Sequence, residues 1–122
     1  MLVVDKEKYK MAIYEERKQV HVQVIGFIKD YLVNEYLNDL QETCNKIKRS
    51  EYTFVVDATY QSPLPAKVSS GLGETIMFYV SQGFKDYTIV NPKSKISKVQ
   101  VRNALEGIPY PGIVVDNASQ LK

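Results

Sequence analysis

The fold that we predict is decided by the stretch YTFVV, residues Tyr52–Val56. It is apolar or β-branched at every position, which is typical of strands buried on both faces, as in parallel sheets. A second run of the same kind, YTIV at Tyr87–Val90, follows further along the chain. The segment between the two runs is long enough for a helical crossover, so we expect the two strands to lie in one sheet and to run in parallel.

Two helices are expected around the second of these strands. The first is predicted over residues 65–82, because a proline is tolerated in the first turn of a helix and Gly83 supplies a C-terminal stop. The second is a shorter helix that Ser94 or Ser97 can cap and that ends before Gly107. A last short strand is predicted at Ile113–Val115.

The region before Tyr52 carries a third helix pattern. Its apolar residues fall at spacings of three and four and form one stripe roughly 100° wide on a helical wheel. They are Val33, Tyr36, Leu37, Leu40, Cys44 and Ile47. Because Cys44 lies in the middle of the stripe, we interpret it as a small core residue.

Two strand patterns open the chain. One extends from about Tyr9 to Glu15, and the other, Val20–Val24, alternates strictly between apolar and polar residues. Their closeness in sequence predicts a β-hairpin, although the turn lacks a glycine. The full order is β-β-α-β-α-β-α-β. It predicts an α/β domain over residues 1–122, with one mixed sheet of four to five strands and an antiparallel edge.

Composition narrows the classes of function. The chain has 122 residues, 44% of them hydrophobic and 25% charged, and its net charge is +2. These values are typical of a globular protein, and the small, scattered charge argues against nucleic acid. No apolar run spans a bilayer, and the first residues do not resemble a secretory signal, so we expect a cytoplasmic protein that does not enter a membrane.

Two stretches resemble the STAS family, the domain of bacterial anti-sigma-factor antagonists. One is the strand ending at Asp57, followed by the serine pair and Gly-Leu-Gly of residues 69–73. The other is the strand Tyr87–Val90 with the helix that ends at Gly107. The resemblance covers residues 11–115. It implies a STAS-like fold, a regulatory role in binding proteins, and a phosphorylation switch at Ser70 or its neighbour Ser69. The alternative for Ser70 is an ordinary solvated serine.

Candidate sites for other chemistry are few. With one histidine and one cysteine, a zinc site is not expected, and no phosphate-binding loop is present, so no cofactor is predicted. His21 falls on the polar side of its strand, and we expect it at the surface or at a sheet edge. Asp57, Thr59 and Asn91 follow predicted parallel strands, where ligands of open α/β sheets bind. Alternatively, Asp and Asn simply end strands and start turns.

The outer face of the helix predicted over 65–82 is a candidate interaction surface. On a helical wheel, two large apolar side chains point outward beside polar ones. The surface comprises Ser70, Glu74, Met77, Phe78 and Ser81.

Three hypotheses of function follow. The leading one is a non-enzymatic, STAS-like domain that presents this helix to a protein partner or to a second copy of itself. The second is a protein that binds or hydrolyses a small polar ligand with Asp57, Thr59 and Asn91. The third is a structural component of a larger assembly.

Overall fold

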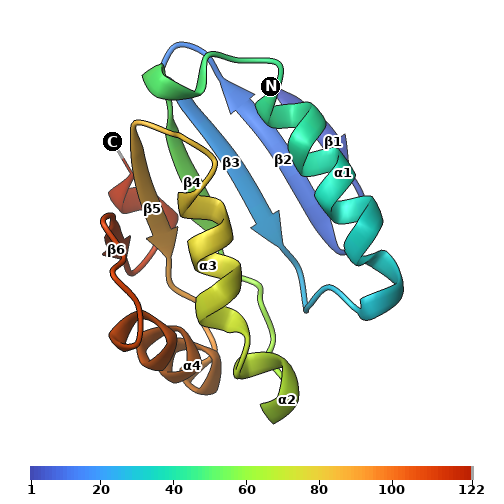
Figure 1. Cartoon of the computed structure of the whole chain (residues 1–122), viewed down its shortest axis with the longest axis vertical. Helices are drawn as coiled ribbons and strands as arrows, with labels where there is room; N and C mark the ends of the chain where they lie inside the picture. Colours follow the sequence, from blue (N-terminus) through green and yellow to red (C-terminus); the bar gives the residue numbers. More distant parts are fainter. Residues whose placement is uncertain (122) are drawn as a thin grey trace.

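A computed structural model describes residues 1–121 and shows an α/β fold with one mixed sheet of six strands (Figure 1). The strands lie side by side in the order in which they occur along the chain. They are β1 (Leu2–Asp5), β2 (Tyr9–Tyr14), β3 (Gln19–Val24), β4 (Thr53–Asp57), β5 (Asp86–Val90) and β6 (Ile113–Val115).

The pairing of the strands confirms the predicted mixture of directions. β1, β2 and β3 pair antiparallel, and β3, β4, β5 and β6 pair parallel. The turn of the β2–β3 hairpin needs no glycine, because Lys18 itself adopts a left-handed conformation with a φ of 55°. The Lys18 amide donates to the Glu15 carbonyl oxygen at 3.3 Å and closes the turn.

The prediction of four to five strands is wrong by one edge strand, β1. This strand has only four residues, and its register against β2 shifts between Leu2 and Val4. The shift interrupts the alternation of sides that marks a strand in the sequence. Leu2 and Asp5 are exposed, as is common at the edge of a sheet, so the apolar pattern there is weak.

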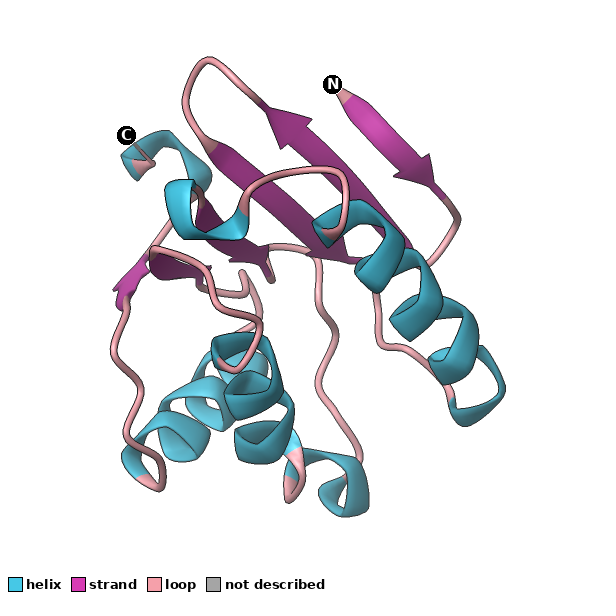
Figure 2. Cartoon of the chain, turned by 45° about the horizontal axis from the view of Figure 1, so that its top comes forward, coloured by secondary structure: helices cyan, strands magenta, loops and turns pink. Residues whose placement is uncertain are grey.

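The α-helices all lie on one side of the sheet (Figure 2). They are α1 (Val33–Cys44), α2 (Ala66–Ser69), α3 (Leu72–Val80) and α4 (Lys95–Glu106), and three short 3₁₀ turns, η1 (Asp30–Leu32), η2 (Arg49–Glu51) and η3 (Ala118–Gln120), complete the list. Ser94 is the N-cap of α4 and accepts a hydrogen bond from the Ser97 amide at 3.3 Å.

The single helix predicted over 65–82 is in fact two helices, α2 and α3, which are separated at Ser70 and Gly71. The hydroxyls of Ser69 and Ser70 donate to the carbonyl oxygens of Ala66 and Lys67, at 3.1 and 2.8 Å. Such bonds compete with the continuing helix, and a glycine in the next position lowers the cost of a break. The pattern of apolar residues continues through the break, which is why the sequence did not reveal it.

The hydrophobic core lies between the sheet and the helices. Strand residues that face the helices, such as Met11, Val22 and Phe54, are fully buried against α1 and α3. Cys44 is also fully buried, which confirms its assignment to the core, and burial raises the pKa of its thiol to about 11. A smaller cluster of Ile76, Ile89 and Val101 joins α3, β5 and α4.

Candidate functional site

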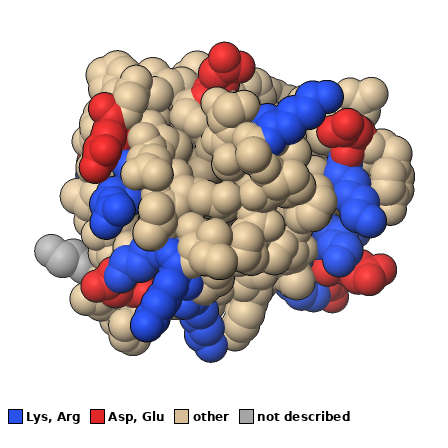
Figure 3. Space-filling view, turned by 90° about the horizontal axis from the view of Figure 1, so that it is seen from below, with Lys and Arg blue, Asp and Glu red and all other residues tan. Residues whose placement is uncertain are grey.

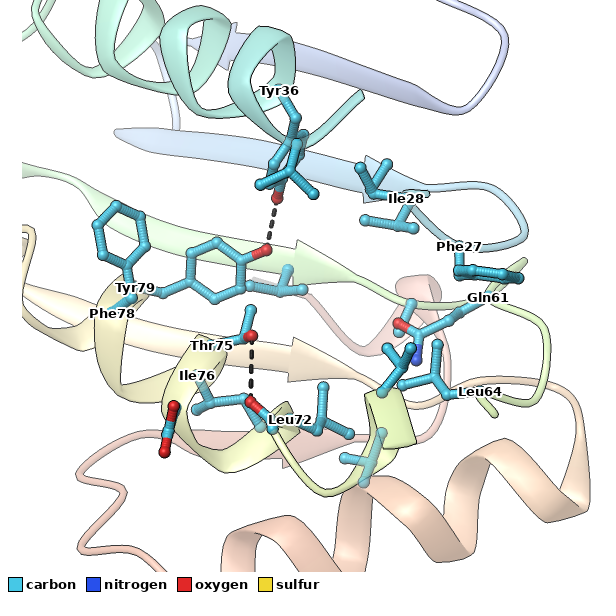
Figure 4. Close-up of a pocket in the computed structure, with 18 of the residues that line it drawn as sticks. Phe27, Ile28, Tyr36, Gln61, Leu64, Leu72, Thr75, Ile76, Phe78 and Tyr79 are labelled. Carbon is cyan, nitrogen blue, oxygen red and sulfur yellow. Dashed lines mark hydrogen bonds between the residues drawn. The ribbon is translucent and has the colours of Figure 1, made fainter. Parts of the chain in front are cut away.

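A cavity of about 440 Å³ opens between α1 and α3 (Figure 4). Its floor includes Val24 at the end of β3, Val56 in β4 and Ala58 just beyond it. The cavity therefore lies at the carboxyl ends of two parallel strands, where open α/β sheets commonly bind ligands. Its volume falls within the usual range for sites that hold small molecules.

The cavity exists because the neighbouring helices leave a gap that their side chains fill only in part. α1 packs against β2, and α3 packs against α4, so each helix has its main contacts away from the other. Aromatic rings fill one part of the gap: the Phe54 ring lies 5.3 Å from that of Tyr79 and 4.9 Å from that of Phe84, between centroids. Towards the start of α3, small residues such as Gly71 and Thr75 leave space.

The walls of the cavity are mainly apolar. They include Phe27, Ile28, Leu64, Leu72, Ile76 and Phe78 (Figure 4). Val68 of α2 also lines the cavity and is 40% exposed. An apolar ligand that covers such a surface removes it from water, which is favourable for binding.

One polar group in the lining has no partner. The side-chain nitrogen Nε2 of Gln61 is shielded from solvent and makes no hydrogen bond to any described residue. The backbone of Gln61 is held in place, because its amide donates to the Ala58 carbonyl oxygen at 3.0 Å and its own carbonyl accepts from Ser97 Oγ at 3.3 Å. A buried donor without a partner costs about 1–3 kcal/mol, so it calls for an explanation.

A pair of tyrosine hydroxyls forms another polar part of the lining. Tyr36 of α1 and Tyr79 of α3 share a hydrogen bond of 2.5 Å between their hydroxyl oxygens (Figure 4). Both side chains are buried, and this burial raises the pKa of each hydroxyl above its usual value. Both hydroxyls therefore keep their protons at neutral pH.

Charge is confined to the margin of the cavity. Asp30 and Glu74 are its charged lining residues, both are exposed, and no Lys, Arg or His belongs to the lining. Figure 3 views the molecule from below, at the end where α2 lies. The middle of that surface is uncharged, and the charged side chains lie around it.

The polar residues predicted at the strand ends do not line this cavity. Asp57 Oδ1 accepts a hydrogen bond from the Thr59 amide at 3.0 Å and another from the Thr59 hydroxyl, and Asp57 Oδ2 accepts from Gln23 at 3.2 Å. Asn91 instead donates to Asp116 Oδ1 at 3.0 Å. The structure thus brings Asp57 and Thr59 together in one turn and joins Asn91 to a different loop.

The residues of the predicted interaction surface divide into two groups. Ser70, Glu74 and Ser81 are exposed, as expected. Met77 and Phe78 are half-buried, and Phe78 packs against the main core and lines the cavity. Phe78 therefore does not point outward as the helical wheel predicts.

The predicted modification site lies at this break. Ser69 is the last residue of α2, and Ser70 lies immediately before Gly71, the N-cap of α3. The Ser70 side chain is exposed.

We expected His21 at the surface or at a sheet edge, and the second alternative is wrong, because β3 pairs with both β2 and β4 and lies inside the sheet. Its ring is half-buried on the face of the sheet away from the helices, and desolvation and nearby Arg17 lower its pKa to about 4.

In residues 1–121, no three His, Cys, Asp or Glu side chains come together as they would around a metal ion. No helix within the same residues has the length and apolar character needed to cross a bilayer.

Sequence reasoning missed the cavity. A signal was present: Phe27, Ile28 and Leu64 are large apolar residues in segments without a helix or strand pattern. Such residues either cover the core or line a site, and only the folded arrangement separates the two cases.

Comparison with known proteins adds no identification. A scan against protein-family models finds no match, and a search of curated proteins finds no similar sequence. The STAS resemblance therefore stays a prediction.

Proposed function

We propose that this protein is a non-enzymatic binding domain that holds a small, mainly apolar molecule in the cavity between α1 and α3. The observation that carries the proposal is the cavity itself, with its volume of about 440 Å³ and its apolar walls. Burial of apolar surface contributes roughly 25 cal/mol per Å², and part of that gain offsets the entropy lost on association.

The lining supports binding rather than catalysis. Nucleophilic catalysis needs an activated side chain beside a base, and the lining contains no Cys, His or Lys. The Thr75 hydroxyl is engaged with the Gly71 carbonyl oxygen at 3.3 Å. The two carboxylates, of Asp30 and Glu74, are exposed at the margin of the cavity, and no base or nucleophile of the lining accompanies them.

The protein-interaction function remains a separate prediction. A partner of the predicted surface would meet Ser70, Glu74 and Ser81, which are exposed, but would find most of Phe78 turned inward. The roles in polar-ligand binding or hydrolysis and in a larger assembly also stay predictions.

Titration with Nile red, an uncharged apolar dye whose fluorescence rises in apolar surroundings, tests the proposed binding function. The deciding variant is Thr75→Phe, because Thr75 lines the cavity and a phenyl ring there occupies its space. The matched control is Ser81→Phe, which adds the same ring to an exposed position of the same region outside the lining. We expect Thr75→Phe to weaken dye binding about tenfold or more, a cost of about 1.4 kcal/mol, and Ser81→Phe to leave it unchanged.

Two outcomes count against binding in the cavity. One is that the wild-type protein does not bind the dye. The other is that both variants bind it as the wild type does while remaining folded by circular dichroism.

A further inference from the structure

We infer that the natural ligand of this cavity is an uncharged molecule that carries a hydrogen-bond acceptor oxygen, such as the carbonyl of a ketone, an ester or a quinone. This inference rests on the proposed binding function and specifies the chemistry of the ligand. It is carried by the polar atoms that the cavity leaves without partners.

The first of these atoms is Gln61 Nε2. It lies in the cavity lining, it is shielded from solvent, and no described residue accepts a hydrogen bond from it. A second glutamine nearby shows the contrast. Gln100 uses both ends of its amide, accepting from the Leu64 amide and donating to the Leu64 carbonyl oxygen, each at 2.9 Å. Both polar ends of the Gln100 side chain are therefore hydrogen-bonded, whereas the Gln61 side chain in the cavity lining keeps a donor without an acceptor.

The tyrosine pair supplies a second donor. Two hydroxyls carry two protons, and the bond between Tyr36 and Tyr79 uses one of them. Neither hydroxyl makes a hydrogen bond to any other group of residues 1–121, so the second proton has no acceptor there. The cavity therefore leaves two donors without acceptors, Gln61 Nε2 and one proton of the tyrosine pair, and a ligand with an acceptor oxygen can satisfy them.

The charges of the lining disfavour an anion, and its unpaired donors disfavour a cation that is itself a donor. An anion would be buried with no cation in the lining and with the carboxylates of Asp30 and Glu74 at the margin. A buried charge without a partner is strongly unfavourable. An ammonium group is itself a donor, so it would face the donors of Gln61 and the tyrosine pair. A neutral carbonyl oxygen meets both constraints.

Three probes with a chain of ten carbons test this chemistry: methyl decanoate, decanoate and decylammonium at pH 7.5, below their aggregation concentrations. Each competes with Nile red on the wild-type protein. We expect methyl decanoate to displace the dye at about a tenfold lower concentration than either ion. In ¹⁵N-labelled protein, the side-chain NH₂ signals of Gln61 should shift with the ester.

The matched variants are Gln61→Leu and Gln120→Leu. Gln61→Leu removes the free donor, and we expect it to weaken methyl decanoate binding roughly three- to tenfold. Gln120→Leu makes the same change at an exposed position outside the cavity lining, so it should change the affinity by less than about twofold.

The outcomes separate the two proposals. The inference is overturned if decanoate or decylammonium competes as well as methyl decanoate, if none of the three probes displaces the dye, or if Gln61→Leu leaves ester binding unchanged. If the Thr75→Phe variant binds Nile red as tightly as the wild-type protein does, the proposed binding function itself is overturned.

Discussion

The two ends of the gap between α1 and α3 are built differently. At the end where both helices finish, Arg49 joins them: its guanidinium donates to the carbonyl and side-chain oxygens of Gln82, each at 3.1 Å, and to Gln41 Oε1 at 3.2 Å. Gln41 in turn donates to Gln82 Oε1 at 3.1 Å. At the other end lies the cavity, where Gln61 Nε2 has no partner.

The difference teaches that the cavity does not follow from helix spacing alone. The same two helices border both ends, yet polar contacts close one end and apolar walls leave the other open. Several hydrogen bonds to Gln82 stabilise one end of the gap, and the other end, with the unpaired Gln61 donor, is where we propose that a ligand binds.

The largest expected effect is on stability, and it differs between a truncation in the filled part of the gap and one at the cavity. Phe54→Ala removes a fully buried ring and should lower the free energy of unfolding by about 3–5 kcal/mol. Leu72→Ala, at the cavity wall, should cost only about 1 kcal/mol because its side chain is half-buried and borders empty space. Urea unfolding measures both, and equal costs would contradict the contrast.

The next effect concerns the closed end. Arg49→Ala removes charge-assisted hydrogen bonds to both helices and leaves Gln82, which is 8% exposed, with fewer partners. We expect a loss of about 2 kcal/mol in the free energy of unfolding. Arg102→Ala, at an exposed position of α4, is the control and should change it by less than about 0.5 kcal/mol. A similar loss of unfolding free energy in both variants would show that the Arg49 hydrogen bonds do not stabilise the closed end.

The tyrosine pair lies between the two ends and predicts a smaller effect. Tyr36→Phe and Tyr79→Phe each remove one partner of the buried bond, and each should cost about 1 kcal/mol. The double variant should cost less than the sum, since removing both hydroxyls leaves neither one unpaired. Additive costs in thermal or urea unfolding would mean that the two hydroxyls do not depend on each other.

The smallest expected effect is at the open end. Gln61→Leu removes a donor that makes no bond, so the ligand-free protein should be equally stable or more stable by up to about 1 kcal/mol. Gln100→Leu is the contrasting variant, because it breaks two bonds to Leu64 and should cost about 1–2 kcal/mol. A clear loss of stability in Gln61→Leu would show that its amide is structural.

The regular elements followed closely from the sequence. Alternation in β3 and the apolar stripe of α1 are repeated local patterns. β3 forms where its pattern predicts, and α1 begins at Val33 as predicted but ends at Cys44, before Ile47, the last residue of the predicted stripe. β1 was missed because its register shift removes the alternation, and the break at Ser70 because the apolar spacing passes through it. Local patterns could not predict the cavity, because it forms where side chains from segments distant in the sequence leave space between them.

The bonds of Arg49 have a mechanical consequence. They tie Gln82, just after α3, to Gln41 of α1, and the Tyr36–Tyr79 bond adds a second link between the two helices. The start of α3 packs instead against α4, because Gly73 lies close to Ala104 and Ile108. At 1.5 Å per residue, the nine residues of α3 span about 13 Å, so a tilt of about 5° about the end at Gln82 would displace the start of the helix by roughly 1 Å. The width of the cavity therefore depends on how closely the start of α3 packs on α4.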